Sequence, residues 1–188
     1  MRTLTRPAAV LAAGALAAAA LTGCSSTASR ATEIRPGTIT SLDDLEPVDD
    51  ADLALTITWD GGEPVRLSID QLEQMRTVEA TIYEPFLKRD VTFQGVELPE
   101  LLMLTGMPDD LDVLHTVALN EYEVDIPADA AMDDAAILAT RADGELIPID
   151  QGGPTRVVLT SDHPDVRDES LWIWSIATIA PGGSVPTS

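Results

Sequence analysis

The chain has 188 residues, with 11 Lys and Arg against 32 Asp and Glu, so its formal net charge at pH 7 is −21. This length fits one ordinary domain with flanking segments. The negative charge argues strongly against a nucleic-acid partner, because a phosphate backbone would be repelled. A single Cys excludes an intramolecular disulfide, a Cys₄ zinc site and a cysteine-held iron–sulfur cluster.

Residues 1–23 have the order of a secretory signal peptide. Two arginines precede the uncharged run from Pro7 to Ala20, which is shorter than the about 20 apolar residues of a transmembrane helix. Leu21-Thr22-Gly23-Cys24 follows and resembles a bacterial lipoprotein box, in which the Cys is acylated and becomes the first mature residue. We expect a lipid anchor on Cys24 that holds the protein at the extracytoplasmic face of the cell membrane; the alternative is a plain signal peptide.

Residues 24–51 are rich in Ser, Thr, Pro and Asp, a composition typical of a solvated, acidic tether. Its apolar residues give it the means to dock partly onto the domain, and docked and free arrangements are both open. These residues are Ile34, Ile39, Leu42 and Leu45. We expect one folded domain over residues 52–181, followed by a disordered tail over residues 182–188.

A hairpin and a short helix are predicted at the start of the domain. Apolar residues alternate from Leu53 to Trp59, and the Gly61-Gly62 turn leads to a returning strand over 65–67. Ser68 and Gln71 have the spacing of a capping box, in which the Ser hydroxyl accepts from the Gln amide, so a helix begins there. Residues 78–83 are predicted to be extended.

The second half predicts more short strands with little helix. A helix is expected over 99–105, with Pro99 in its first turn, and a brief helical segment over 127–132. Asp143-Gly144 is a strong hairpin signal. The other expected strands span 113–119, 122–126, 136–141, 145–147, 156–160 and 172–179. This pattern predicts an α+β domain, a mixed sheet or partial barrel with two or three short helices.

The predicted core comes from the inward positions of this pattern: Leu55, Ile57, Trp59, Leu101, Val117, Val157, Leu159 and Trp174. The polar candidates are less informative. Asp109, Asp110 and Asp112 lack the remaining ligands of an EF-hand loop, so we expect a solvated face. His163 is predicted in a surface turn and His115 in the core or the sheet. Residue chemistry alone therefore predicts an acidic domain and no reaction.

Five features in order resemble a known family. They are Phe93-Gln94-Gly95-Val96-Glu97-Leu98 with its following Leu101-Leu102, Tyr122 to Pro127, Ala139 to Pro148, Asp150 to Val158, and Trp172. Together they resemble the sulfite-oxidase-type molybdopterin-binding domain of oxidoreductases that use a molybdenum pterin. The resemblance covers about Leu53 to Ile179 and implies that family's fold.

The resemblance also implies cofactor-binding positions, should a cofactor be bound: Tyr122, Arg156, Gly152 and Gly153. The two glycines let the chain turn into the strand of Arg156. A sheet-edge aromatic is the structural alternative for Tyr122, and an ion-paired strand residue is the alternative for Arg156. No catalytic residue and no metal ligand is assigned.

The departures from the family concern the metal and the phosphate. Active members have a molybdenum-ligating Cys before the Gly-Val element, whereas residues 80–86 contain no thiol. Gln151 stands where the family often has His, and Leu171 where it often has Lys.

Two hypotheses about function follow. The first is a non-catalytic binding or accessory module without cofactor, whose partner is an envelope protein or a small molecule. The alternative is an envelope oxidoreductase that uses a molybdenum pterin for oxygen-atom or electron transfer. The missing Cys favours the first, as do the seven Lys and Arg against 26 Asp and Glu over residues 52–181, a net charge of −19.

Overall fold

The computed structural model describes residues 30–59 and 61–182. The predicted lipidation site Cys24 and signal peptide 1–23 lie outside these residues, as does most of the predicted tail. Within the described ranges, no helix has the length and apolar character needed to cross a bilayer.

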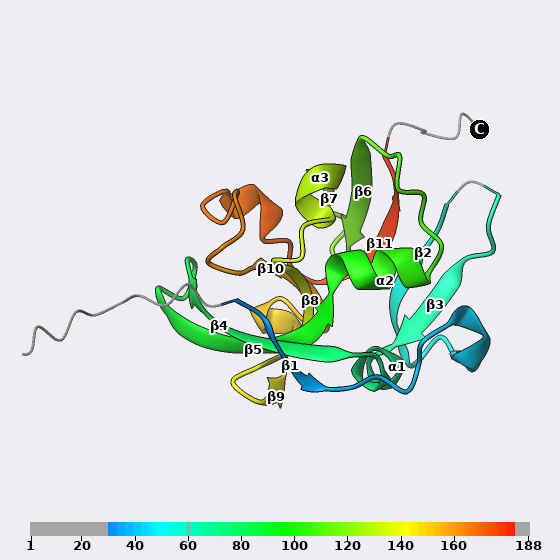
Figure 1. The fold of residues 1–188 in the computed structure, drawn as a ribbon, viewed down its shortest axis with the longest axis horizontal. Helices are drawn as coiled ribbons and strands as arrows, with labels where there is room; N and C mark the ends of the chain where they lie inside the picture. Colours follow the sequence, from blue (N-terminus) through cyan, green and yellow to red (C-terminus); the bar gives the residue numbers. More distant parts are fainter. Residues whose placement is uncertain (1–29, 60, 183–188) are drawn as a thin grey trace, which may run out of the picture.

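Two β-sheets form the framework of the domain (Figure 1). In the first, the strand order is β1 (Thr32–Arg35), β4 (Thr77–Glu84), β5 (Arg89–Glu97), β8 (Ala136–Ala142) and β10 (Arg156–Leu159), and β9 (Glu145–Leu146) pairs with β8. In the second, it is β3 (Val65–Ser68), β2 (Leu53–Ile57), β11 (Ile176–Pro181), β6 (Val113–Ala118) and β7 (Glu123–Pro127). Among the strand pairs that the structure describes, β2 and β11 are the only parallel one. The α+β prediction is confirmed as two sheets with few short helices.

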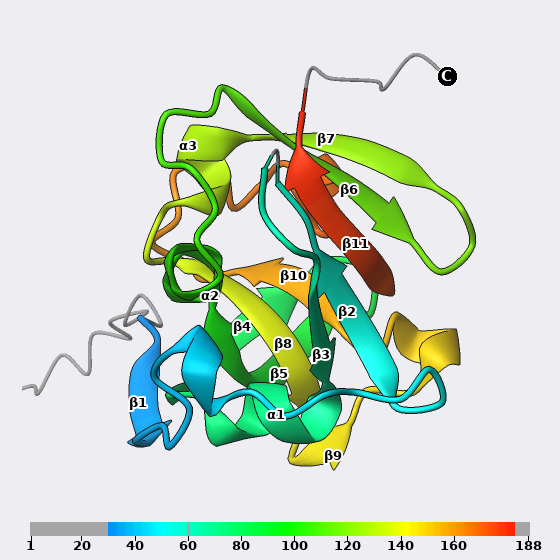
Figure 2. The same cartoon turned by 90° about the vertical axis from the view of Figure 1, so that its right-hand side faces the viewer.

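Three short α-helices accompany the sheets: α1 (Ile69–Gln74), α2 (Leu98–Leu104) and α3 (Ala128–Ala131). Single 3₁₀ turns are η1 (Leu42–Asp44), η2 (Ile149–Gln151) and η3 (Glu169–Leu171). The capping box at α1 is present, since the backbone N–H of Gln71 donates to the Ser68 hydroxyl at 3.2 Å. Figure 2 shows α2 end-on beside β8 of the first sheet, and its Leu101 and Leu102 are fully buried.

The hydrophobic core lies between the two sheets. Of the predicted core residues, five are buried: Leu55, Ile57, Leu101, Val157 and Leu159. Trp59 and Trp174 are only half-buried, and the prediction for Val117 is wrong. In β6, the inward positions are Leu114, Thr116 and Ala118, and the Thr116 hydroxyl donates to the Val124 carbonyl at 2.8 Å. The register of β6 therefore turns Val117 outward.

Part of the predicted tether is held on the domain. β1 pairs antiparallel with β4, so that Thr32 lies opposite Glu79. The backbone N–H of Thr38 donates to the Gln74 carbonyl at 2.7 Å, and Ile39 is buried. The segment is therefore docked through the pairing of β1 and through Ile39, whereas Ile34 and Leu42 are exposed.

The β4–β5 hairpin is the longest element of the first sheet and reaches beyond its neighbours (Figure 1). Its turn is held by a backbone hydrogen bond and by the Asp143 side chain. The Lys88 amide donates to the Glu84 carbonyl at 2.8 Å, and the Asp143 carboxylate accepts from Thr92 N–H at 3.0 Å and from Arg89 at 2.8 Å. The hairpin thereby places Glu84 and the residues after it at one end of the molecule.

Candidate functional site

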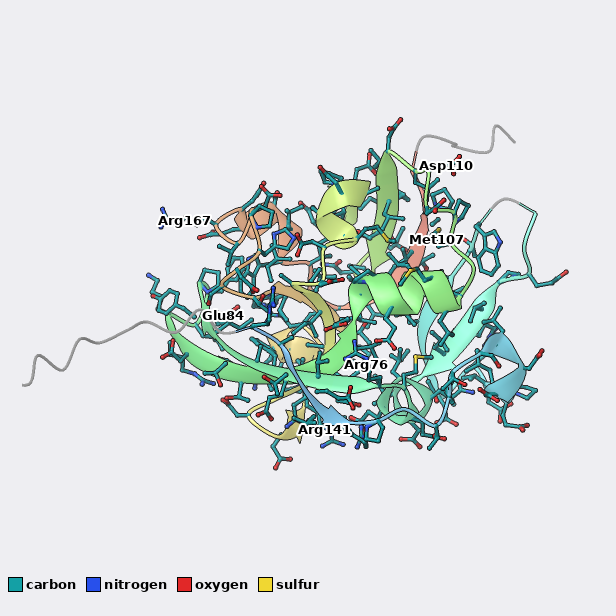
Figure 3. The ribbon with its side chains drawn as sticks, in the orientation of Figure 1. Arg76, Glu84, Met107, Asp110, Arg141 and Arg167 are labelled. Carbon is teal, nitrogen blue, oxygen red and sulfur yellow. The ribbon has the colours of Figure 1, made fainter. Side chains whose placement is uncertain are left out.

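A buried ion pair joins β4 to β10 beside the turn of this hairpin. Glu84 ends β4 and Arg156 begins β10, and their side chains are 0% and 2% exposed. Arg156 Nη2 donates to Glu84 Oε1 at 2.9 Å, and the other carboxylate oxygen accepts the backbone N–H of Leu87. Figure 3 shows Glu84 at this end of the molecule. Since both oxygens are engaged, the carboxylate is fixed as the counter-charge of Arg156.

Aromatic rings enclose the guanidinium of Arg156. Its central carbon lies 4.7 Å from the Trp174 ring centroid and 5.3 Å from that of Phe93. A desolvated cation–π contact contributes about 2 kcal/mol. Burial lowers the pKa of Arg156, and Glu84 partly offsets this by hydrogen bonding and by its charge. An arginine stays charged at neutral pH in proteins, so the pair is ionic.

A groove with aromatic walls lies on the outer side of Trp174. We call it the aromatic groove, with a volume of about 330 Å³, and define it by Phe86, Tyr122, Trp172, Trp174, Asn120 and Glu169. Phe86 meets Trp174 edge to face, with the ring centroids 5.4 Å apart. Phe86 comes from the β4–β5 turn, Tyr122 from the β6–β7 turn, and the two tryptophans from the segment between η3 and β11. Three separate segments thus build one concave surface.

Trp174 is held in place by the chain beneath it. Gly152 has a φ of 89°, and a Cβ at this position would lie 2.7 Å from the indole ring. The Ser175 amide donates to the Gly152 carbonyl at 2.7 Å. Trp172 is buried, and its indole N–H donates to the Val166 carbonyl at 3.2 Å. The left-handed backbone of Gly152 therefore makes the room that Trp174 occupies.

The structure brings three of the four predicted cofactor-binding residues to the surroundings of Trp174. Tyr122 is 64% exposed and lines the aromatic groove, Arg156 lies under the indole, and Gly152 supports it. Gly153 instead packs on Ile147, whose carbonyl oxygen would lie 1.8 Å from a Cβ there. Their role toward a cofactor stays a prediction.

Sequence reasoning did not bring the groove residues together. Trp172 was predicted only as a family feature and Trp174 only as a core residue, although their spacing of two places both on one side of an extended segment. Glu84 gave no signal, because its partner is 72 residues away in the sequence.

The two histidines lie away from the groove residues. The predicted surface turn at Asp162 to Asp165 is present, but within it His163 is only 2% exposed. Its Nε2 donates to the Ala130 carbonyl at 3.0 Å, and its Nδ1 accepts the Asp165 N–H at 2.9 Å. His115 is half-buried in the sheet, with Nδ1 2.8 Å from Asp125. Within the described residues, no group of three or more His, Asp or Glu side chains is placed to hold a metal ion.

The lining of the aromatic groove has the wrong charge for an anionic pterin phosphate. Among the described lining residues there is no Lys or Arg, and the charged one is Glu169. The nearby positive charge of Arg156 is buried, and its Nη2 is paired with Glu84, while its Nε has no hydrogen-bond partner among the described residues. Residues 80–86 contain no thiol. The groove lining therefore offers no cation for a phosphate, and residues 80–86 offer no thiolate for molybdenum.

Comparison with solved structures finds a similar fold in the sulfane dehydrogenase SoxCD from Paracoccus pantotrophus. The TM-score is 0.56 at 16% sequence identity, over 76% of this chain and 41% of that one. The chain thus spans about two fifths of SoxCD. No curated protein matches the sequence significantly.

A sequence model of a protein family covers most of the described domain. It is that of the oxidoreductase molybdopterin binding domain, and it matches residues 44–162. The order of sequence motifs, the two sheets and this match agree, and the chain belongs to the oxidoreductase molybdopterin binding domain family.

Proposed function

We propose that this protein is a lipid-anchored binding or accessory module that has the family's domain without its cofactor and without redox chemistry. The observation that carries the proposal is the buried ion pair of Glu84 and Arg156 under Trp174. A cation that already has a buried counter-charge offers an incoming phosphate little, since binding would first have to break the pair.

The neighbouring positions support the same proposal. Leu171 is apolar and buried, and Gln151 is exposed and uncharged, at the two places where the family often has basic residues. A charge-assisted hydrogen bond contributes about 1.5–3 kcal/mol, so losing two of them weakens phosphate binding by orders of magnitude. The net charge of −19 over residues 52–181 adds repulsion.

The test is the cofactor content of the protein purified from its own host. We expect no molybdenum by elemental analysis and no fluorescence of oxidised pterin after acid release. A family member that has the Cys, purified from the same cells, is the positive control. Near-stoichiometric molybdenum or pterin in this protein would overturn the proposal.

The second candidate is a molybdenum-pterin oxidoreductase of the cell envelope, favoured by family membership and by Tyr122 and Arg156 at positions that resemble the family's site. A bound cofactor would supply the redox chemistry there, and the chain would contribute Tyr122 and Arg156 as binding groups. The same molybdenum and pterin measurement separates the two candidates, and these two residues would then be the first to mutate.

The proposed anchor has its own test. Two or three acyl chains hold a protein stably on a membrane, whereas a protein without them is released. We expect Cys24→Ser to move the protein from the membrane fraction to the soluble fraction. Retention on membranes after an alkaline wash would contradict the lipid anchor.

A further inference from the structure

We infer that the aromatic groove binds a small organic cation of the alkylated ammonium class, such as a quaternary ammonium compound. The inference rests on the proposed function, because a groove free of the family's anionic cofactor is what leaves these walls available. It adds to that proposal the chemical class of the ligand and the residues that hold it.

The aromatic residues of this chain gather at one place. The sequence contains three Trp, two Tyr and two Phe, and four of these seven line the aromatic groove. Two more lie close by, since Phe93 contacts the other side of Arg156 and Tyr83 lines the adjoining pocket that shares Glu169. Rings around a cavity are how proteins hold quaternary ammonium groups.

Two of the four rings are clearly exposed to the groove, whereas Trp174 is half-buried and Trp172 is buried. Tyr122 is 64% exposed and Phe86 is 45% exposed. The Asn120 side-chain oxygen accepts the backbone N–H of Tyr122 at 3.1 Å, which fixes the turn that carries this ring. A volume of about 330 Å³ is at the lower end of the range for small-molecule pockets, about 300–1,000 Å³. The groove therefore suits a compact ligand.

The charge of the groove selects a cation. Glu169 lines it, is exposed, and has no ion-pair partner in the part of the chain that the structure describes. Arg156 lies behind Trp174, but Glu84 at 2.9 Å cancels its charge. The charges around the groove are thus the carboxylate of Glu169 and a buried pair with no net charge, in a domain of net charge −19. Their combined electric field raises the local concentration of cations.

A neutral planar ligand is the competing occupant, because it would use the same aromatic walls. Such a ligand would gain no electrostatic attraction to the Glu169 carboxylate or to the negative faces of the rings, which attract positive charge. A pair of probes with one shape and different charge therefore separates the two. Choline and its uncharged isostere 3,3-dimethylbutan-1-ol form such a pair.

The experiment titrates the full-length protein with each probe at constant ionic strength, followed by tryptophan fluorescence and by calorimetry. We expect saturable binding of choline, about tenfold or more weaker binding of the isostere, and weakening of choline binding at high salt. Glu169→Gln and Tyr122→Leu should each raise the Kd for choline about 2- to 5-fold. The matched control for the charge, Glu63→Gln, lies outside the groove lining and should leave the Kd for choline unchanged.

The outcomes keep this inference apart from the proposed function. In protein shown to lack molybdenum and pterin, the absence of a saturable choline signal overturns the inference alone. Equal binding of choline and the isostere, or an unchanged Kd in both groove variants, also overturns it. Molybdenum or pterin in the purified protein overturns the proposed function, whatever choline does.

Discussion

Removing the negative charge at position 84 should destabilise the domain strongly. Glu84→Gln leaves the guanidinium of Arg156 charged, 2% exposed and without a counter-charge, while the amide keeps about the same size and one acceptor oxygen. The Trp174 and Phe93 rings remain around the guanidinium, but they replace only part of the lost attraction.

The magnitude follows from the burial of both partners. Breaking a buried ion pair by removing one charge costs about 3–5 kcal/mol. For a domain of this size, 1 kcal/mol lowers the Tm by about 2–4 °C, so Glu84→Gln should lower it by roughly 6–20 °C. Removing both charges, in Glu84→Gln with Arg156→Met, leaves no isolated charge. We expect that double variant to lie within about 1–2 kcal/mol of the wild type.

The assay is urea and thermal unfolding of the wild type, both single variants and the double variant at pH 7. The control is Glu73→Gln, which removes a partner of the more exposed pair with Arg141, whose Nε lies 2.6 Å from Glu73, and should cost about 1 kcal/mol. A loss below that of the control in Glu84→Gln would refute the reasoning. So would a double variant whose loss equals the sum of the single losses.

Three further predictions concern other parts of the fold. In urea unfolding, Gly152→Ala should cost about 1–2 kcal/mol because its backbone is left-handed, and about 1–3 kcal/mol more because the new Cβ would contact Trp174. Gly144→Ala should show only the first of these losses, because Gly144 also has a left-handed φ of 85° but no atom lies near a Cβ there. Hydrogen bonds from the backbone N–H of Thr92 and then from Arg89 lower the pKa of Asp143, so this carboxylate stabilises the fold above its unfolded pKa of about 3.9 and loses that effect as the pH falls through its lower folded pKa. In urea unfolding at a series of pH values, Asp143→Asn should lose less unfolding free energy than the wild type as the pH falls below about 4. An identical loss in the two proteins would contradict the role of this carboxylate. Ile39→Ala should loosen residues 30–51, seen as faster proteolysis before Asp52 with the domain fragment left intact; an unchanged cleavage rate would mean that Ile39 does not hold the segment.

Local signals in the sequence predicted local structure well. The alternation from Leu53, the capping box at Ser68 and the Asp143-Gly144 turn each involve residues close in the chain, and each is present. β1 was not predicted, because its four residues are all exposed and show no apolar alternation. The first half of β5 has few apolar residues, and its pairing with β4 is what makes it a strand.

The candidate site was predictable only in part, for a similar reason. The resemblance to the family located Tyr122, Arg156 and Gly152, three residues that surround Trp174. The charge environment of Arg156 depends on Glu84, which lies on a distant strand. The groove that Tyr122 lines is built from three segments that are far apart in the sequence. Long-range pairing of this kind leaves no periodic trace in the sequence.

The attachment of β1 to β4 limits how far the domain can stand from a membrane. With residues 24–51 wholly free, some 27 residues would allow a reach of about 90 Å at full extension. Because the chain is tied to the first sheet from Thr32, about eight residues remain between a lipid on Cys24 and the sheet, a reach of at most about 28 Å. The proposed anchor would therefore keep the edge that carries β1 near the bilayer surface and restrict the orientations in which a partner meets the domain.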